Sequence, residues 1–297
     1  MTKTILLTAL AALLAGTLGG CVVDQPYPYQ AAQPVDTSAA PVLATDDTEE
    51  QAPEPPPPIP VYDQPPCPVE GYVWTPGVWR WGAEGYFWVP GTWVAPPQVG
   101  FLWTPGYWGV VGVTYVFHPG HWGHNVGYYG GINYGHGYDG DGYRGGRWEN
   151  NRFRYNTAVT NVNVTNVHNV YNERVVNNVT VNNVAVNTPR PSWVGGAGTR
   201  AQPTPGEAAR VNEPRFRPMP IQQQHHFDAQ AEPALNAARN EGRPPIAGTP
   251  RPSAFRAPEV TPAKPVGEIY RPQRPMPRDE KRDERPRDER PRDDRPH

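Results

Sequence analysis

The sequence predicts a mainly β protein with extensive disorder, in which a small Trp-rich β-hairpin or meander module is flanked by low-complexity segments. Two observations lead to this fold class. Of the 297 residues, 40 are proline and 30 are glycine, while only 37% are hydrophobic, so we expect much of the chain not to pack. A short aromatic phrase also recurs four times at intervals of 14, 15 and 14 residues, which suits short strands joined by turns.

Residues 1–20 are predicted to be a signal peptide. An apolar run from Ile5 to Leu18 is followed by two glycines that lead directly to Cys21. Small residues that end at a cysteine resemble a bacterial lipoprotein signal, and this resemblance implies that the Cys21 thiol is acylated and holds the chain on a membrane. An ordinary secretory signal or a short membrane span is the alternative, although the apolar run is brief for a span.

Residues 21–66 are predicted to be an acidic, proline-rich tether. The 45 residues after Cys21 contain eight Asp or Glu and no Lys or Arg, and they include the run PEPPPPIP. Proline favours extended polyproline geometry at about 3.1 Å per residue, so this segment would reach on the order of 100 Å from a membrane.

Residues 67–124 form the predicted repeat module, with the phrase Y-x-W-x-P-G-x-W. Its fourth copy is weaker because Phe117 stands in the first tryptophan position. Proline and glycine suit the central positions of a type II turn, with glycine at positive φ, so we expect Trp74 to face Trp79 across a Pro76–Gly77 turn. The repeat residues that carry this prediction are Tyr72, Trp74, Gly77, Trp79, Tyr86, Trp88, Gly91, Trp93, Phe101, Trp103, Gly106, Trp108 and Trp122.

Two interpretations compete for the aromatic face that these hairpins would create. Its rings are either the core of the module or a platform that stacks on sugars, led by Trp74, Trp88 and Trp103. Exposing half of the 15 aromatic side chains would forfeit about 35 kcal/mol of burial, which a segment poor in Leu and Ile does not recover elsewhere. We therefore favour the core, with self-association through incompletely covered rings as a further alternative.

The copies resemble the YXWGXW-repeat, or WXXGXW, family of bacterial envelope lipoproteins. The likeness rests on Trp74-x-x-Gly77-x-Trp79 and its counterparts that start at Trp88 and Trp103. The resemblance implies a cell-envelope address and no established activity. It also implies Gram-negative bacteria, where Val22 lacks the aspartate typical of inner-membrane retention. We therefore expect a lipid anchor in the outer membrane, on the periplasmic face by default, with surface exposure left open.

Four segments follow the module. Residues 125–150 are rich in Gly and Tyr, and residues 151–188 are rich in Asn and Val and are expected to form strands. Residues 189–275 are basic and rich in Pro and Ala, with short helices expected between Ile221 and Glu241. Residues 276–297 form an Arg/Asp/Glu/Pro tail that has no apolar side chain from Arg278 onward, which predicts disorder.

No catalytic residue, metal site or cofactor is predicted. The only serines are Ser38, Ser192 and Ser253, all outside the repeats, so a serine nucleophile is disfavoured. A glycosidase pair of Glu84 with Asp139 stays a weak alternative. His118, His121 and His124 have metal-like spacing, but a turn at Pro119–Gly120 would place the third histidine on the opposite face. The DGDG run that starts at Asp139 lacks further calcium ligands.

Charge and cysteine content suggest partners without identifying one. From Arg144 to Arg274 there are 17 Arg or Lys against nine Asp or Glu, a surplus that would suit peptidoglycan or another anionic polysaccharide, while no fold that recognises specific nucleic acids is apparent. With Cys21 acylated, Cys67 is left either free or bridged to another chain. The sequence thus predicts a non-enzymatic, lipid-anchored envelope protein with a structural or scaffolding role; the alternative is a peptidoglycan- or polysaccharide-binding module that uses the repeat tryptophans.

Overall fold

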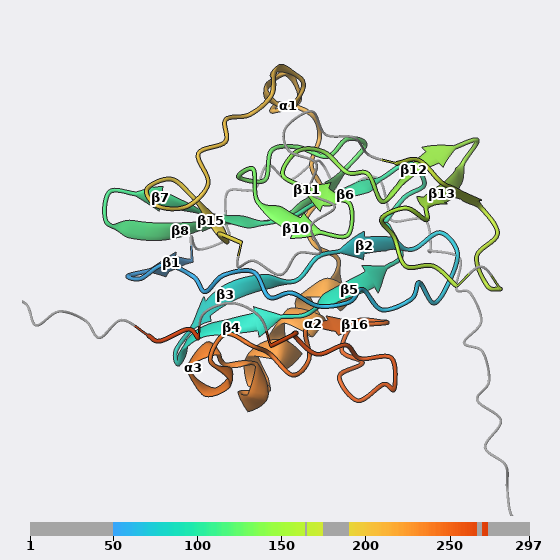
Figure 1. Ribbon diagram of the computed structural model, residues 1–297. Helices are drawn as coiled ribbons and strands as arrows, with labels where there is room; N and C mark the ends of the chain where they lie inside the picture. Colours follow the sequence, from blue (N-terminus) through green and yellow to red (C-terminus); the bar gives the residue numbers. More distant parts are fainter. Residues whose placement is uncertain (1–49, 164, 175–189, 266–268, 273–297) are drawn as a thin grey trace, which may run out of the picture. The chain divides into compact units, whose positions relative to one another are not determined.

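A computed structural model describes residues 50–163, 165–174, 190–265 and 269–272 (Figure 1). These residues all belong to one compact unit, Pro34–His297. Among the described residues, strands account for 31% and helices for 12%, and the strands form several small sheets, which confirms the mainly β prediction. The predicted signal peptide, Cys21 and the charged tail lie outside the described residues.

The first two copies of the repeat form one long hairpin, here called hairpin 1. Its four strands are β2 (Val73–Thr75), β3 (Val78–Gly82), β4 (Gly85–Val89) and β5 (Gly91–Val94). The antiparallel pairs β3–β4 and β2–β5 share one register, since Val78 is opposite Val89 and Thr75 is opposite Thr92. The chain reverses between Gly82 and Gly85, and the Pro-Gly segments interrupt the strands midway.

The third and fourth copies repeat this plan as hairpin 2. Its strands are β6 (Leu102–Thr104), β7 (Tyr107–Val111), β8 (Thr114–His118) and β9 (His121–Gly123). β7 pairs with β8 and β6 pairs with β9, again in one continuous register. The reversal lies at Gly112–Val113, and Pro105–Gly106 and Pro119–Gly120 are the interruptions.

The prediction that Pro76–Gly77 forms the hairpin turn is wrong. Trp74 is opposite Trp93 and Trp79 is opposite Trp88, so the facing residues come from different copies. A type II turn matches the twist of two paired strands poorly, and proline has no N–H to donate to a ladder. The Pro-Gly segments therefore break the ladder, and other parts of the chain satisfy it: Gly77 N donates to the Tyr62 hydroxyl and Gly91 N to the Ala247 carbonyl.

Segments far away in the sequence cover the edges of both hairpins. β1 (Gln51–Ala52) pairs with β8, and β15 (Trp193–Val194) pairs with β7, which gives the sheet order β1-β8-β7-β15. β16 (Gly248–Thr249) pairs with β5. Each addition satisfies edge backbone groups that would otherwise be open to other chains.

Residues 50–66 differ from the predicted tether, because they lie in the folded part. Ala52, Ile59 and Tyr62 are buried, and Ile59 N donates to the Arg190 carbonyl. A proline-rich segment in polyproline geometry makes no internal hydrogen bonds, so its backbone carbonyls are free to accept. Indole N–H groups of the core donate to such carbonyls, which explains why the segment packs against the repeats.

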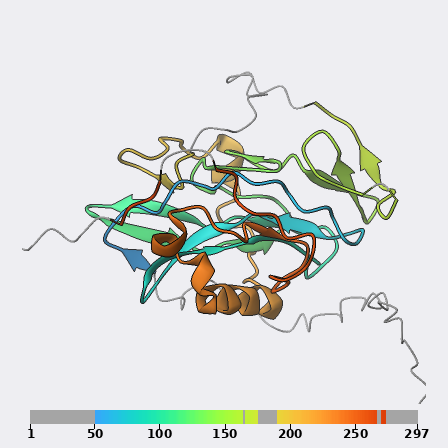
Figure 2. The same ribbon diagram turned by 60° about the horizontal axis from the view of Figure 1, so that its bottom comes forward.

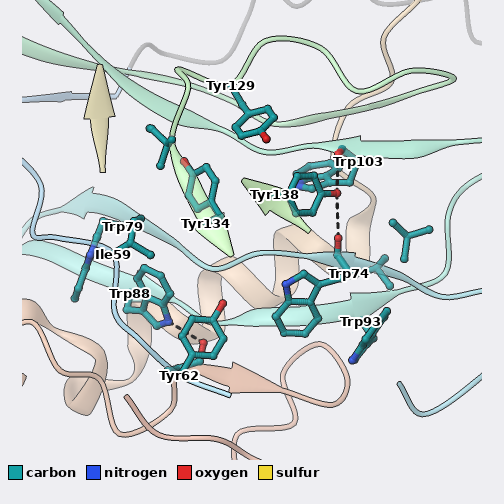
Figure 3. Close-up of a cluster of buried hydrophobic side chains, with 14 of the residues drawn as sticks. Ile59, Tyr62, Trp74, Trp79, Trp88, Trp93, Trp103, Tyr129, Tyr134 and Tyr138 are labelled. Carbon is teal, nitrogen blue, oxygen red and sulfur yellow. Dashed lines mark hydrogen bonds between the residues drawn. The ribbon is translucent and has the colours of Figure 1, made fainter. Parts of the chain in front are cut away.

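The Gly/Tyr-rich segment joins the two hairpins. It contains β10 (Asn133–Gly135) and β11 (Tyr138–Asp139), which pair with each other. The Tyr138 hydroxyl lies 2.8 Å from the Trp103 carbonyl of hairpin 2 and 3.3 Å from the Trp74 carbonyl of hairpin 1 (Figure 3). This segment is therefore part of the core.

The rest of the described chain adds a small sheet and short helices. β12 (Gly146–Glu149), β13 (Arg152–Asn156) and β14 (Val170–Tyr171) form a three-stranded sheet, so strands occur in the Asn/Val-rich segment, of which residues 164 and 175–188 lie outside the described part. The helices are α1 (Pro205–Ala209), α2 (Pro220–Ala231), η1 (Pro233–Leu235) and α3 (Ala237–Asn240).

The helices predicted between Ile221 and Glu241 are present, with the expected break at Glu232–Pro233. Both α2 and α3 lie against β4 (Figure 2). They cover Phe87, which points away from the facing tryptophans and is buried. Among the described residues, no helix has the length and apolar character needed to cross a bilayer.

Candidate functional site

Each hairpin contains two pairs of aromatic rings that face each other across the strands. The ring centroids of each pair are 5.0 to 5.3 Å apart, with the planes inclined by 55° to 65°, which is the geometry that the quadrupoles of aromatic rings favour. Phe117, the exception in the fourth copy, takes the place of a tryptophan in one pair. The four pairs are Trp74–Trp93, Trp79–Trp88, Trp103–Trp122 and Trp108–Phe117.

These rings are core residues. Trp103 is the most exposed of the seven motif tryptophans, at 8%, and the other six are completely buried. Figure 3 labels five of the seven within the core cluster. Three of the indole N–H groups donate to carbonyls of the flanking segments, Trp79 to Pro58, Trp93 to Pro65 and Trp88 to Ala247. Trp74 Nε1 is buried without a hydrogen-bond partner among the described residues. The rings are therefore not available as a surface on which sugars would stack. Of the other aromatic residues of the motif, Tyr86 and Phe101 are buried and Tyr72 is half-buried.

The glycine of each motif supplies space beneath a ring of the facing strand. A Cβ on Gly91 would lie 2.5 Å from Trp74 Cζ2, and one on Gly106 would lie 2.6 Å from Phe117 Cζ. In the same way, a Cβ on Gly77 would clash with the Trp88 ring and a Cβ on Gly120 with the Trp103 ring. None of these four glycines has positive φ, so the predicted role in a type II turn is wrong and close approach is the reason for glycine.

The Pro-Gly interruptions of both hairpins line a groove of about 580 Å³. Its other wall is formed by α2 and by Arg217, which has no ion-pair partner among the described residues. Sequence reasoning missed this groove, because its two walls are at least 97 residues apart along the chain. The lining residues from the interruptions are Pro76, Pro90, Gly106, Pro119 and Gly120, and those from α2 are Gln222, Gln223, His225, His226 and Phe227.

Charged and aromatic groups meet in the wall of the groove, where Glu50, Arg80 and Phe117 are lining residues. The Arg80 guanidinium lies 4.3 Å from the centre of the Phe117 ring and forms an ion pair of 2.6 Å with Glu50, which also accepts from Trp81 N. Burial raises the pKa of Glu50 despite the neighbouring Arg80. This part of the groove wall thus presents a cation over an aromatic face.

Two histidines of α2 face the groove. His225 Nδ1 accepts from Ser253 N at 2.9 Å, which leaves Nε2 to donate to the Pro90 carbonyl at 2.8 Å. Burial lowers the pKa of His225 to about 4 and that of His226 to about 3, so both rings are neutral near pH 7. His226 Nδ1 and Thr92 Oγ1 are buried at the groove without a hydrogen-bond partner in the described part of the chain.

The structure separates the other candidate residues. The His118 ring stacks on Tyr107 at 4.6 Å, whereas the His124 ring meets Phe101 at 4.7 Å. Over the described ranges, no three His, Cys, Asp or Glu side chains are placed to hold a metal ion. Glu84 lies in the turn between β3 and β4 and forms an exposed ion pair with Arg239, whereas Asp139 lies on β11.

Cys67 is buried and forms no disulfide bond within the part of the chain that the structure describes. Its thiol donates to the Val69 carbonyl at 3.2 Å, and burial raises its pKa to about 12. A thiol in this position does not reach another chain without unfolding.

The comparison with protein families identifies the unit of the repeat. The WXXGXW repeat model matches twice, at residues 71–94 and 99–123, so the chain contains two copies of this repeat. These ranges coincide with hairpin 1 and hairpin 2, and each family unit is therefore one complete hairpin with two W-x-x-G-x-W or related phrases. Comparisons with curated proteins and with solved structures gave no significant match.

Proposed function

We propose that this chain is a non-enzymatic, lipid-anchored protein of the cell envelope, with a structural or scaffolding role at the periplasmic face of the outer membrane. The observation that carries the proposal is the burial of the repeat tryptophans, three of which donate their N–H groups to backbone carbonyls of the flanking segments. A motif used in this way stabilises a module rather than recognising a ligand. The buried Ser192, whose hydroxyl donates to Pro57, fits a role without a serine nucleophile.

Acylation of Cys21 is tested by growth with labelled palmitate. We expect label in the wild-type chain and none in Cys21→Ala, with the wild type recovered in the outer-membrane fraction. Label in neither chain, or recovery of both in the soluble fraction, contradicts the anchor. The structural role is tested separately by acrylamide quenching, for which we expect protected, blue-shifted tryptophan emission that purified peptidoglycan does not change.

The groove favours a second candidate function, the binding of an acidic glycan such as peptidoglycan. It places Arg217 and the exposed Phe227 ring in one groove with two buried polar atoms that have no partner among the described residues. Aromatic faces and cations of this kind suit sugar rings and carboxylates. In this candidate the ligand contacts the groove instead of the tryptophan rings.

Pull-down with purified peptidoglycan separates the two functions. Arg217→Ala and Phe227→Ala alter exposed groove residues, and Phe227 is 59% exposed, so we expect both variants to fold. Ile221→Ala is the matched control, since Ile221 lies on α2 at 45% exposure outside the groove. Glycan binding predicts retention by the wild type and the control but not by the groove variants, whereas the structural role predicts no retention that depends on the groove.

A further inference from the structure

The two hairpins have the same arrangement of strands, but the surroundings of their turns differ. At the turn of hairpin 1, Asn236 donates to the Glu84 carbonyl at 2.9 Å and Arg239 pairs with the Glu84 carboxylate at 3.3 Å. The equivalent turn of hairpin 2 has Val113 in the position of Glu84. Val113 is 89% exposed and Val111 is 65% exposed, the largest exposures among the big apolar side chains of the described residues.

The strands β7 and β8 that form this second turn, and β15 beside them, carry no Asp, Glu, Lys or Arg; the nearest acidic residues, Glu50 and Glu54, flank β1 on the other side of β8. No such charged residue is present from Tyr107 to Phe117, and none from 191 to 199, the segment that contains β15 and runs beside β7. The half-buried Trp193 meets Tyr115 edge to face at 6.2 Å. In Figure 1 the turn between β7 and β8 lies at the left edge, and neither α2 nor α3 covers it. The tip thus combines exposed aliphatic side chains with Trp and Tyr, the mixture typical of a membrane interface.

The size of the tip argues against a protein partner. A stable protein interface buries about 800 Å² on each partner, much more than two valine side chains provide. Insertion of a few apolar side chains among lipid headgroups needs only a small patch.

The chain that leads from the proposed anchor joins the folded part at this hairpin. Residues 22–49 lie outside the described part and end at Glu50, whose carbonyl accepts from Phe117 N on β8 at 2.9 Å. Phe117 is four residues from Val113, or about 13 Å along a strand. A chain held at Cys21 therefore enters the folded part at hairpin 2, the hairpin whose turn exposes Val111 and Val113.

We propose that the tip of hairpin 2, Val111–Val113, inserts into the surface of the membrane that holds Cys21. This inference rests on the proposed lipid anchor and adds a second, apolar contact that fixes the orientation of the module. Because the tip is uncharged, the contact is with the interface of the lipid layer in general, and it does not depend on anionic headgroups or on salt.

The test uses the full acylated chain in phosphatidylcholine vesicles, with an environment-sensitive fluorophore on Val113→Cys. Glu84→Cys carries the same label at the equivalent position of hairpin 1 and serves as the control. We expect the label at 113 to shift to the blue and to be quenched by brominated acyl chains, in low and high salt, while the label at 84 is unchanged. No quenching at 113, or equal quenching at both positions, overturns the proposal.

A second variant separates insertion from proximity. In Val113→Glu, which copies the residue of hairpin 1, a label on Val111→Cys should lose its quenching although palmitate still enters Cys21; retained quenching contradicts insertion. If palmitate does not enter the wild-type chain, the anchor fails. The label at 113 is then read with excess vesicles, and the absence of a shift rejects the insertion as well.

Discussion

Trp79 and Trp88 face each other across β3 and β4, with ring centroids 5.0 Å apart and planes inclined by 65°. Trp88 also covers Gly77, which lies two residues before Trp79 in the interruption between β2 and β3. In return, Trp74 of the first strand covers Gly91 of the second. The spacing W-x-x-G-x-W therefore encodes two reciprocal contacts, a ring against a ring and a ring against a glycine, and both need the facing copy.

Replacement of Trp88 tests the ring pair. Trp88→Ala should lower the free energy of unfolding by about 3–5 kcal/mol, because it removes a buried ring and leaves a cavity. Trp88→Phe should cost clearly less, since the Trp108–Phe117 pair already has this composition at 5.3 Å. Urea unfolding followed by circular dichroism measures both. Equal losses for the two variants would show that the indole itself, with its bond to Ala247, is decisive rather than the ring contact.

Replacement of Gly91 tests the ring-glycine contact. In Gly91→Ala the new methyl group would lie 2.5 Å from Trp74 Cζ2 and 2.9 Å from Gly77 N, so we expect a loss of about 1–3 kcal/mol from overpacking. Gly123→Ala is the matched control, because its nearest neighbour is an ordinary 3.5 Å away. Thermal unfolding of the two variants gives the comparison. A Gly91→Ala chain as stable as the control would be incompatible with the role assigned to this glycine.

The sequence predicts the strands and the burial of the rings, because both follow from local composition and from the energy of burying aromatic side chains. It does not predict which copies face each other. Pro76–Gly77 has the composition of a turn, whereas the real reversal at Gly112–Val113 has no proline and that between Gly82 and Gly85 has only Ala83 and Glu84. The fourteen-residue period is compatible with a turn inside each copy and also with a hairpin made of two copies. Only the observed strand pairing shows that two copies form each hairpin.

The groove and the folded part of the predicted tether are not predictable for a related reason. A proline-rich segment has no apolar periodicity, so nothing local indicates that the Pro58 and Pro65 carbonyls accept indole N–H groups. Likewise, the helical composition of 221–241 predicts α2 but not the strand it covers. These features arise from contacts between segments that are remote in sequence, for which a single chain gives no signal.

The buried histidine of α2 predicts a loss of stability in mild acid. The unfolded pKa of histidine is about 6.5, whereas that of His225 in the fold is lowered to about 4 by burial. Between these values the unfolded chain binds a proton that the folded chain does not, so stability is present above about pH 6.5 and is lost as the pH falls toward 4. The shift of His225 corresponds to about 3 kcal/mol.

Urea unfolding between pH 7 and pH 4 measures this effect. His225→Gln should be less stable than the wild type at pH 7 but should lose less on acidification, while His168→Gln, at an exposed position, should follow the wild type. Part of the pH dependence of the free energy of unfolding should remain in His225→Gln, because burial also lowers the pKa of other histidines. An unchanged pH dependence in His225→Gln would refute the assignment. The remaining contributors are His121, His136 and His226.

The buried position of Cys67 predicts that its thiol does not react in the folded chain. Burial raises its pKa to about 12, so the thiolate that thiol reagents require is scarce at neutral pH, and the side chain is only 1% exposed. A maleimide added to the native Cys21→Ala chain should label it negligibly, and urea should make labelling complete. Val113→Cys in the same background is the positive control, because its exposed position should react at once. Rapid labelling of Cys67 in the native chain, or a dimer that a reducing agent dissociates, would contradict this prediction. Either result would mean that the segment around Cys67 opens in solution and that Cys67 can form a disulfide with another chain.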